Sequence, residues 1–227
     1  MNTHHTYLWI NFFTILGPLL FSFLPHYNFH KKWRHLFPAI LLTGTFFLVW
    51  DAFFTARGIW HFNPLYVVGL YAYELPLEEY LFFFTVPYAC TFIYHCLFIH
   101  SKKIVLSQQA NKHLLFLSIV CAIGSLFLFS KTYTFSVLFL MSLFVPLSQL
   151  ILKKKSLDNF LLAYLISIFP MLIVNGFLTS LPVVIYNNDF NSSIRLGSIP
   201  IEDFGYNFIL LAMCIGLYDW LQSRKRI

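Results

Sequence analysis

Two pairs of acidic residues stand at the starts of apolar stretches in this 227-residue chain. Residues 76–79 read Pro-Leu-Glu-Glu, and residues 200–203 read Pro-Ile-Glu-Asp. Together the pairs hold four of the nine acidic residues. Neighbouring carboxyl groups can share one proton, which equips a site to donate a proton and take one back. The catalytic candidates are therefore Glu78, Glu79, Glu202 and Asp203.

Each pair is expected in the first turn of a helix. Proline suits that turn because its missing N–H would have no partner there. Acidic residues at such a position can have a purely structural role, because they interact favourably with the helix dipole. The duplication, and the apolar run that follows each pair, favour a functional role instead. Adjacent helical residues point about 100° apart, so at most one acid of each pair should face the site.

Further residues are candidates for binding the substrate. Asp51 lies near the end of the second apolar run, and Phe82 and Phe83 follow the first acidic pair. Tyr206 and Asn207 follow Glu202 and Asp203 by four residues and so share their helix faces. Aromatic side chains beside the acids could stabilise a carbocation through their π-faces.

The composition points to the membrane. Hydrophobic residues make up 59% of the chain, and charged residues only 11%, against about 25% in a typical soluble domain. In lipid the backbone must satisfy its own hydrogen bonds, so the spans should be α-helices. The fold class predicted is an all-α integral membrane protein in the lipid bilayer, and no nucleic acid is expected as a partner despite the net charge of +6.

Seven spans are predicted, over residues 7–24, 35–56, 76–99, 114–130, 133–152, 159–181 and 200–221. With seven spans the loops alternate between the two sides of the membrane, and one side receives twelve of the fifteen basic residues. These twelve are Lys31, Lys32, Arg34, Lys102, Lys103, Lys112, Lys153, Lys154, Lys155, Arg224, Lys225 and Arg226. The positive-inside rule then puts the C-terminus in the cytoplasm and the N-terminus outside.

An internal repeat relates the two acidic pairs. A shift of 124 residues superimposes Pro76 on Pro200, Glu78 on Glu202 and Cys90 on Cys214. The same shift places Asp51 on Asn175, which is expected to be a helix–helix hydrogen-bonding residue. We therefore predict two parallel three-helix repeats, residues 1–100 and 132–227, joined by a linker helix within residues 101–131.

Several common sites are absent from the sequence. It has no glycine-rich dinucleotide loop, no P-loop, and no His/Cys cluster with metal-ligand spacing. Neither a cofactor nor a metal is expected.

The acidic motifs and their surroundings resemble those of the small membrane-embedded lycopene β-cyclases, in the form where two subunits are fused in one chain. Trp50-Asp51, Gly58-Ile59-Trp60 and residues 75–83 resemble the first subunit, and residues 199–204 resemble the second. The resemblance implies carotenoid biosynthesis, with lycopene or a related linear carotene as the substrate. It implies a non-redox, acid-catalysed cyclisation of one or both end groups to β-ionone rings, which is an isomerase or intramolecular lyase reaction.

Two other functions are kept open. A carotenoid end-group hydratase would share the acid step but quench the carbocation with water. A small-solute transporter can have the same layout of repeats. Such a transporter would place polar residues near the midplane of the membrane, where this sequence has few.

Overall fold

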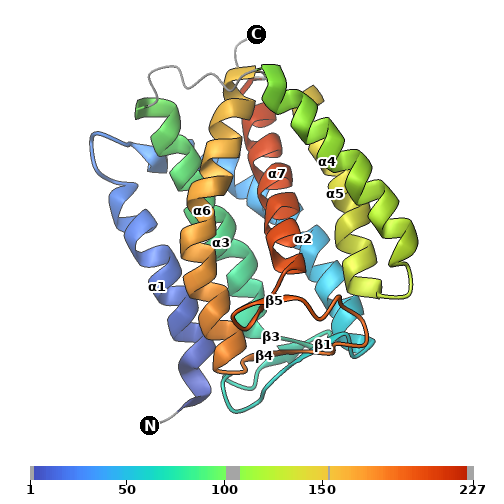
Figure 1. Ribbon diagram of the computed structural model, residues 1–227. Helices are drawn as coiled ribbons and strands as arrows, with labels where there is room; N and C mark the ends of the chain where they lie inside the picture. Colours follow the sequence, from blue (N-terminus) through green and yellow to red (C-terminus); the bar gives the residue numbers. More distant parts are fainter. Residues whose placement is uncertain (1–2, 101–107, 153, 224–227) are drawn as a thin grey trace.

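The chain folds as a bundle of α-helices, seven of them in the part described by the computed structural model, which covers residues 3–100, 108–152 and 154–223 (Figure 1). The helices are α1 (Thr6–Phe21), α2 (Trp33–Ala56), α3 (Leu77–His100), α4 (Gln108–Phe127), α5 (Thr132–Ile151), α6 (Lys154–Ser180) and α7 (Glu202–Ser223). Two short 3-10 helices, Thr3–His5 and Phe29–Lys32, precede α1 and α2. The predicted all-α class is confirmed.

Five helices are long and apolar enough to cross a membrane, namely α2, α3, α5, α6 and α7. The chain is therefore a multi-pass membrane protein. Helix α1 has 16 residues, and the apolar part of α4 runs only over Lys112–Phe127, so their crossing stays a prediction. Of the twelve basic residues in the charge argument, six lie outside the described residues: Lys102, Lys103, Lys153, Arg224, Lys225 and Arg226.

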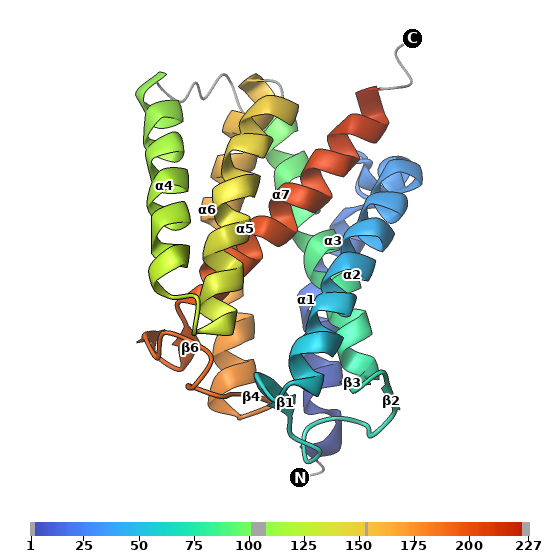
Figure 2. The same cartoon turned by 90° about the vertical axis from the view of Figure 1, so that its right-hand side faces the viewer.

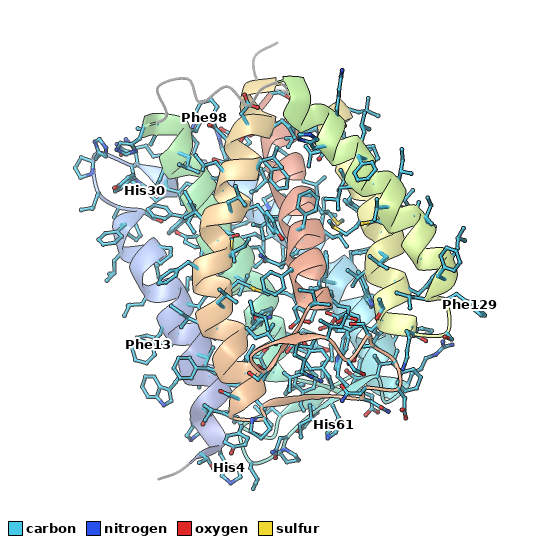
Figure 3. All side chains as sticks on the ribbon, in the orientation of Figure 1. His4, Phe13, His30, His61, Phe98 and Phe129 are labelled. Carbon is cyan, nitrogen blue, oxygen red and sulfur yellow. The ribbon has the colours of Figure 1, made fainter. Side chains whose placement is uncertain are left out.

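Six short strands gather at one end of the bundle, near the start of α1 (Figure 2). They are β1 (Trp60–Phe62), β2 (Tyr71–Ala72), β3 (Leu75–Pro76), β4 (Val184–Tyr186), β5 (Arg195–Leu196) and β6 (Ile199–Pro200). Helix α7 ends at the opposite end of the bundle. His61 marks the strand end and Phe98 the other end (Figure 3).

Two tight hairpins feed the chain into α3 and α7. Strands β2 and β3 are joined by Tyr73 and Glu74, both with positive φ, which is the backbone of a type I′ turn. The hairpin of β5 and β6 turns at Gly197, also with positive φ. Pro76 pairs with Tyr71 in the first hairpin, and α3 begins one residue later. The prediction that this proline opens the helix was therefore wrong, while the acids do lie in the first turns of α3 and α7.

The strand pairing follows the 124-residue repeat. Strand β1 pairs antiparallel with β4, and His61 lies opposite Ile185, its own equivalent in the other half. The hairpin pair Tyr71–Pro76 corresponds in the same way to Arg195–Pro200. A self-complementary register of this kind is what a twofold relation between the halves requires.

Helix packing follows the same twofold relation between the halves. Helix α1 packs on α3 as α5 packs on α7, and α2 packs on α7 as α6 packs on α3. Helix α4 breaks the symmetry by packing on α5 (Figure 1). Gly205 lets α7 approach α5 closely, because a Cβ there would lie 2.5 Å from Val137 Cγ1. These contacts hold the two acidic turns beside the same interior space.

Candidate active site

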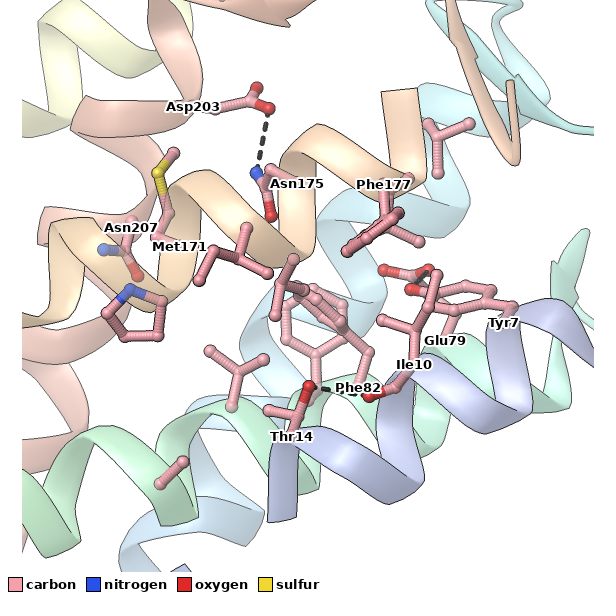
Figure 4. A pocket seen from close by; sticks show the side chains of 18 of the residues that line it. Tyr7, Ile10, Thr14, Glu79, Phe82, Met171, Asn175, Phe177, Asp203 and Asn207 are labelled. Atoms are coloured by element: carbon pink, nitrogen blue, oxygen red, sulfur yellow. Dashed lines mark hydrogen bonds between the residues drawn. The ribbon is translucent and has the colours of Figure 1, made fainter. Parts of the chain in front are cut away.

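A cavity of about 800 Å³ lies inside the bundle, walled mainly by α1, α3, α6 and α7. In Figure 4, Ile10 and Thr14 on α1 face Met171 and Phe177 on α6 across it. Its volume is within the range of small-molecule pockets, which are mostly apolar and have a few convergent polar groups. Here the polar groups are carboxyls and tyrosines that collect near the strand end.

Asp51 and Glu79 form a pair of buried carboxyls in the cavity wall. They lie close enough for each carboxyl to affect the electrostatics of the other. Tyr206 donates its hydroxyl to Asp51 Oδ1 at 2.6 Å, and Tyr7 donates to Glu79 Oε2 at 2.5 Å. Two interacting carboxyls in a buried site can share one proton.

Asp203 is a third buried carboxyl in the wall and has a different environment. It accepts hydrogen bonds from Tyr133 at 2.7 Å and from Tyr186 at 3.1 Å. It also accepts a hydrogen bond from Asn175 Nδ2 at 3.1 Å (Figure 4). All three partners donate, and three donors favour the ionised form of a carboxyl group.

Tyr186 reaches the cavity from strand β4, outside the helices. Burial raises the pKa of its hydroxyl well above the ordinary value, and the nearby charge of Asp203 raises it further. The hydroxyl therefore keeps its proton at neutral pH and remains a donor to Asp203.

Cationic partners are missing from the cavity wall: the described residues that line it include no Lys, Arg or His. Hydrogen bonds from neighbouring side chains therefore stabilise the three carboxyls. Such a site can hold a transferable proton and, at the same time, a negative charge close to an apolar ligand.

Glu78 and Glu202 do not line the cavity but are fully or almost fully buried. Glu78 Oε1 accepts the backbone N–H of Val68 at 2.7 Å. Glu202 Oε1 accepts the equivalent N–H of Ser192, also at 2.7 Å, as well as the hydroxyl of Thr134. The first acid of each pair therefore ties down the loop that precedes its helix, while the second acid faces the cavity.

Seven of the nine predicted site residues line this one cavity. Besides the three carboxyls they are Phe82, Phe83, Tyr206 and Asn207. The positions of all seven on α2, α3 and α7 result from helix packing across the two halves of the chain.

The cavity reaches the outer surface of the bundle between α1 and α6. Trp9 and Phe13 on α1 line it and are 56% and 66% exposed, and Phe177 on α6 is 53% exposed. These exposed rings make the mouth of the cavity apolar. Phe13 projects outward from α1 (Figure 3).

The chain matches a known protein family. A family model described as lycopene cyclase matches residues 4–97 and 130–221. The chain belongs to the lycopene cyclase family. The two matched segments also show the internal repeat. No curated protein and no solved structure matches the chain.

Membership of the lycopene cyclase family indicates a carotenoid cyclase with a carotene substrate.

Three tyrosines of the site, Tyr7, Tyr133 and Tyr186, were not among the residues predicted from the sequence. A signal existed for two of them. Tyr7 and Tyr133 lie in the first turns of α1 and α5, 126 residues apart, and each bonds the second acid of its own half. Asn175 makes the expected bond between helices, but its partner is the site residue Asp203.

Proposed function

We propose that this protein is a lycopene β-cyclase, which converts the linear end groups of lycopene to β-ionone rings without net oxidation or reduction. One observation carries the proposal: three buried carboxyls stand at the inner wall of an apolar cavity whose mouth is lined by exposed apolar side chains. Lycopene is an apolar polyene that dissolves in the bilayer, so an entrance on the membrane side suits it.

The Asp51–Glu79 pair is the proton donor in this proposal. Its shared proton passes to the terminal double bond of the end group, and a tertiary carbocation forms. The next double bond attacks that cation and closes the ring, which leaves a second tertiary cation. Loss of a proton from the adjacent ring carbon gives the β-ring. The carbons that gain and lose a proton are bonded to the same ring carbon, so the same pair can take the proton back.

Asp203 stabilises the cation in this proposal. Its charge is fixed by three donors before the substrate arrives, so little reorganisation is needed when positive charge develops. The π-faces of Trp60, Phe82 and Phe83 in the cavity wall add to this stabilisation. The apolar lining also excludes the water that would otherwise capture the cation.

Glu78 and Glu202 are positioning residues in the proposal. Each accepts a backbone N–H ten residues earlier in the chain and so fixes the loop before its helix. This division refines the expectation that all four motif acids are catalytic, since Glu79 and Asp203 alone of the four line the cavity.

The proposed membrane arrangement has two parallel three-helix repeats, residues 1–100 and 132–227, with α4 as the linker. The strand register and the helix contacts support this arrangement, because both are equivalent in the two halves. We propose that the strand end lies outside and that the C-terminal end of α7 lies in the cytoplasm. The described members of the set of twelve basic residues support this, because they lie near the starts of α2, α4 and α6 or just before α2, away from the strands.

The function is tested by expressing the chain in a bacterial host that accumulates lycopene and analysing the pigments. Carotene with one or two β-rings is the expected product. Unchanged lycopene, with the protein present in the membrane fraction, would sink the proposal. A hydroxylated acyclic product would identify a hydratase.

A further inference from the structure

The 124-residue repeat makes the cavity beside α6 equivalent to a second region, beside α2. Aromatic rings fill this second region (the filled place). Met171, Val174 and Leu178 on α6 form part of the cavity wall. Their equivalents on α2 are Phe47, Trp50 and Phe54, all of them buried. The first set leaves space beside it, whereas the second set is larger at every position.

Phe47 and Trp50 pack against α7, and Phe54 packs against Trp60 and Tyr133. The ring centroids of Phe47 and Tyr206 are 4.9 Å apart, and those of Trp50 and Tyr206 are 5.1 Å apart. Phe47 stacks on Trp50 at 5.7 Å. Trp50 Nε1 is buried and has no hydrogen-bond partner among the described residues, so this indole contributes volume and not a polar contact.

Tyr206 sits between the filled place and the open cavity. Its ring packs on Phe47 and Trp50, while its hydroxyl donates to Asp51 in the cavity wall. The equivalent residue in the first half is Phe82, which lines the cavity and has no hydroxyl. The ring of Tyr206 therefore helps to fill the position equivalent to the cavity, while its hydroxyl forms part of the site inside the cavity.

We propose that the two repeats make a single active site and that each binding event cyclises one end group. This inference rests on the proposed function. A conjugated polyene is stiff, and its two end groups lie at opposite ends of the molecule. When one end lies against the carboxyls, the other extends through the mouth between α1 and α6 into the lipid. A two-ring product then requires the one-ring carotene to leave, reverse and bind again.

The test follows product formation by the wild-type enzyme in liposomes that contain lycopene. Isotope-labelled one-ring carotene is added at the start in an amount equal to the lycopene. With a single site, the two-ring product takes up label in proportion to the labelled share of the one-ring pool. An enzyme that stops at one ring also supports the proposal.

Two-ring product that forms without label would overturn the single site while leaving the cyclase function intact. Absence of any cyclic product would instead refute the proposed function itself. The two failures are therefore distinguishable in one experiment.

A variant pair tests the same point by another route. Met171→Phe copies the equivalent Phe47 into the open cavity, and Leu165→Phe adds the same ring on the exposed side of α6, away from the cavity. With one site, Met171→Phe slows both ring closures by the same factor, roughly tenfold or more, because misplaced reacting groups lose rate steeply. Leu165→Phe keeps the wild-type rate. A loss of no more than half of the total rate in Met171→Phe, with wild-type membrane levels, would indicate a second working site.

Discussion

Asp51 on α2 and Asn175 on α6 occupy equivalent positions, 124 residues apart, and each interacts with the second acid of its own half. Asp51 meets Glu79, and Asn175 meets Asp203. A carboxyl can carry a transferable proton, whereas an amide cannot. The repeat therefore creates two similar acid positions, and this one substitution gives them different chemistry.

Changing Asn175 to aspartate should abolish that difference. The new carboxyl would share a proton with Asp203 and remove the negative charge that faces the cation. We expect kcat to fall about 10²-fold, the typical loss when one preorganised electrostatic group is removed, with KM little changed. Asn175→Ala removes the donor without adding an acid and should be less harmful. Equal losses in the two variants would argue against the proposed role of an amide that donates a hydrogen bond but does not titrate.

Changing Glu79 to glutamine should stop proton sharing with Asp51. We expect a loss of about 10²–10⁴-fold in the rate of ring formation, as for removal of a general acid. Glu78→Gln is the matched control on the same turn, because a glutamine oxygen can still accept from Val68. Its loss should be several-fold at most. The rates are measured with solubilised enzyme, and a more severe effect in Glu78→Gln would reverse the assignment of the two acids.

The hydroxyls of Tyr7 and Tyr133 should both be needed for full activity, since each donates to the second acid of its half. Replacement of either by phenylalanine removes one bond to a carboxyl, which is worth roughly 1.5–3 kcal/mol. We expect at least a tenfold lower kcat with an intact fold, because the backbone N–H of each residue still bonds its loop. Tyr164→Phe, which loses a bond to a backbone carbonyl away from the cavity, should keep its activity.

The contact between α5 and α7 should be sensitive to a single methyl group. Gly205→Ala would place Cβ 2.5 Å from Val137 Cγ1 and force the helices apart. Overpacking of this kind costs about 1–3 kcal/mol of stability. Thermal unfolding in detergent should show a lower midpoint, and Val137→Ala in the same chain should recover part of the loss. Wild-type stability of Gly205→Ala would show that this interface is loosely packed.

Much of the fold could be predicted from the sequence. Apolar stretches of about 20 residues identify helices whatever their neighbours, because hydropathy and length are local properties. The placement of both acidic pairs in first turns followed from the apolar runs behind them. The start of α3 was displaced by one residue, because Pro76 belongs to a hairpin whose turn at Tyr73 and Glu74 was not recognised.

The sequence by itself determined the class of the protein, its acidic motifs, its repeat and its resemblance to the lycopene cyclases. The tertiary structure decided which acid of each pair faces the cavity, because adjacent residues diverge by about 100° and the neighbours set the rotation of each helix. It also supplied the tyrosine partners, which lie 72 and 70 residues away from their acids in the chain. The tertiary structure also decided that the region beside α2 is filled while the equivalent region beside α6 is open. This difference depends on how side chains from separate helices pack together, which no local sequence pattern predicts.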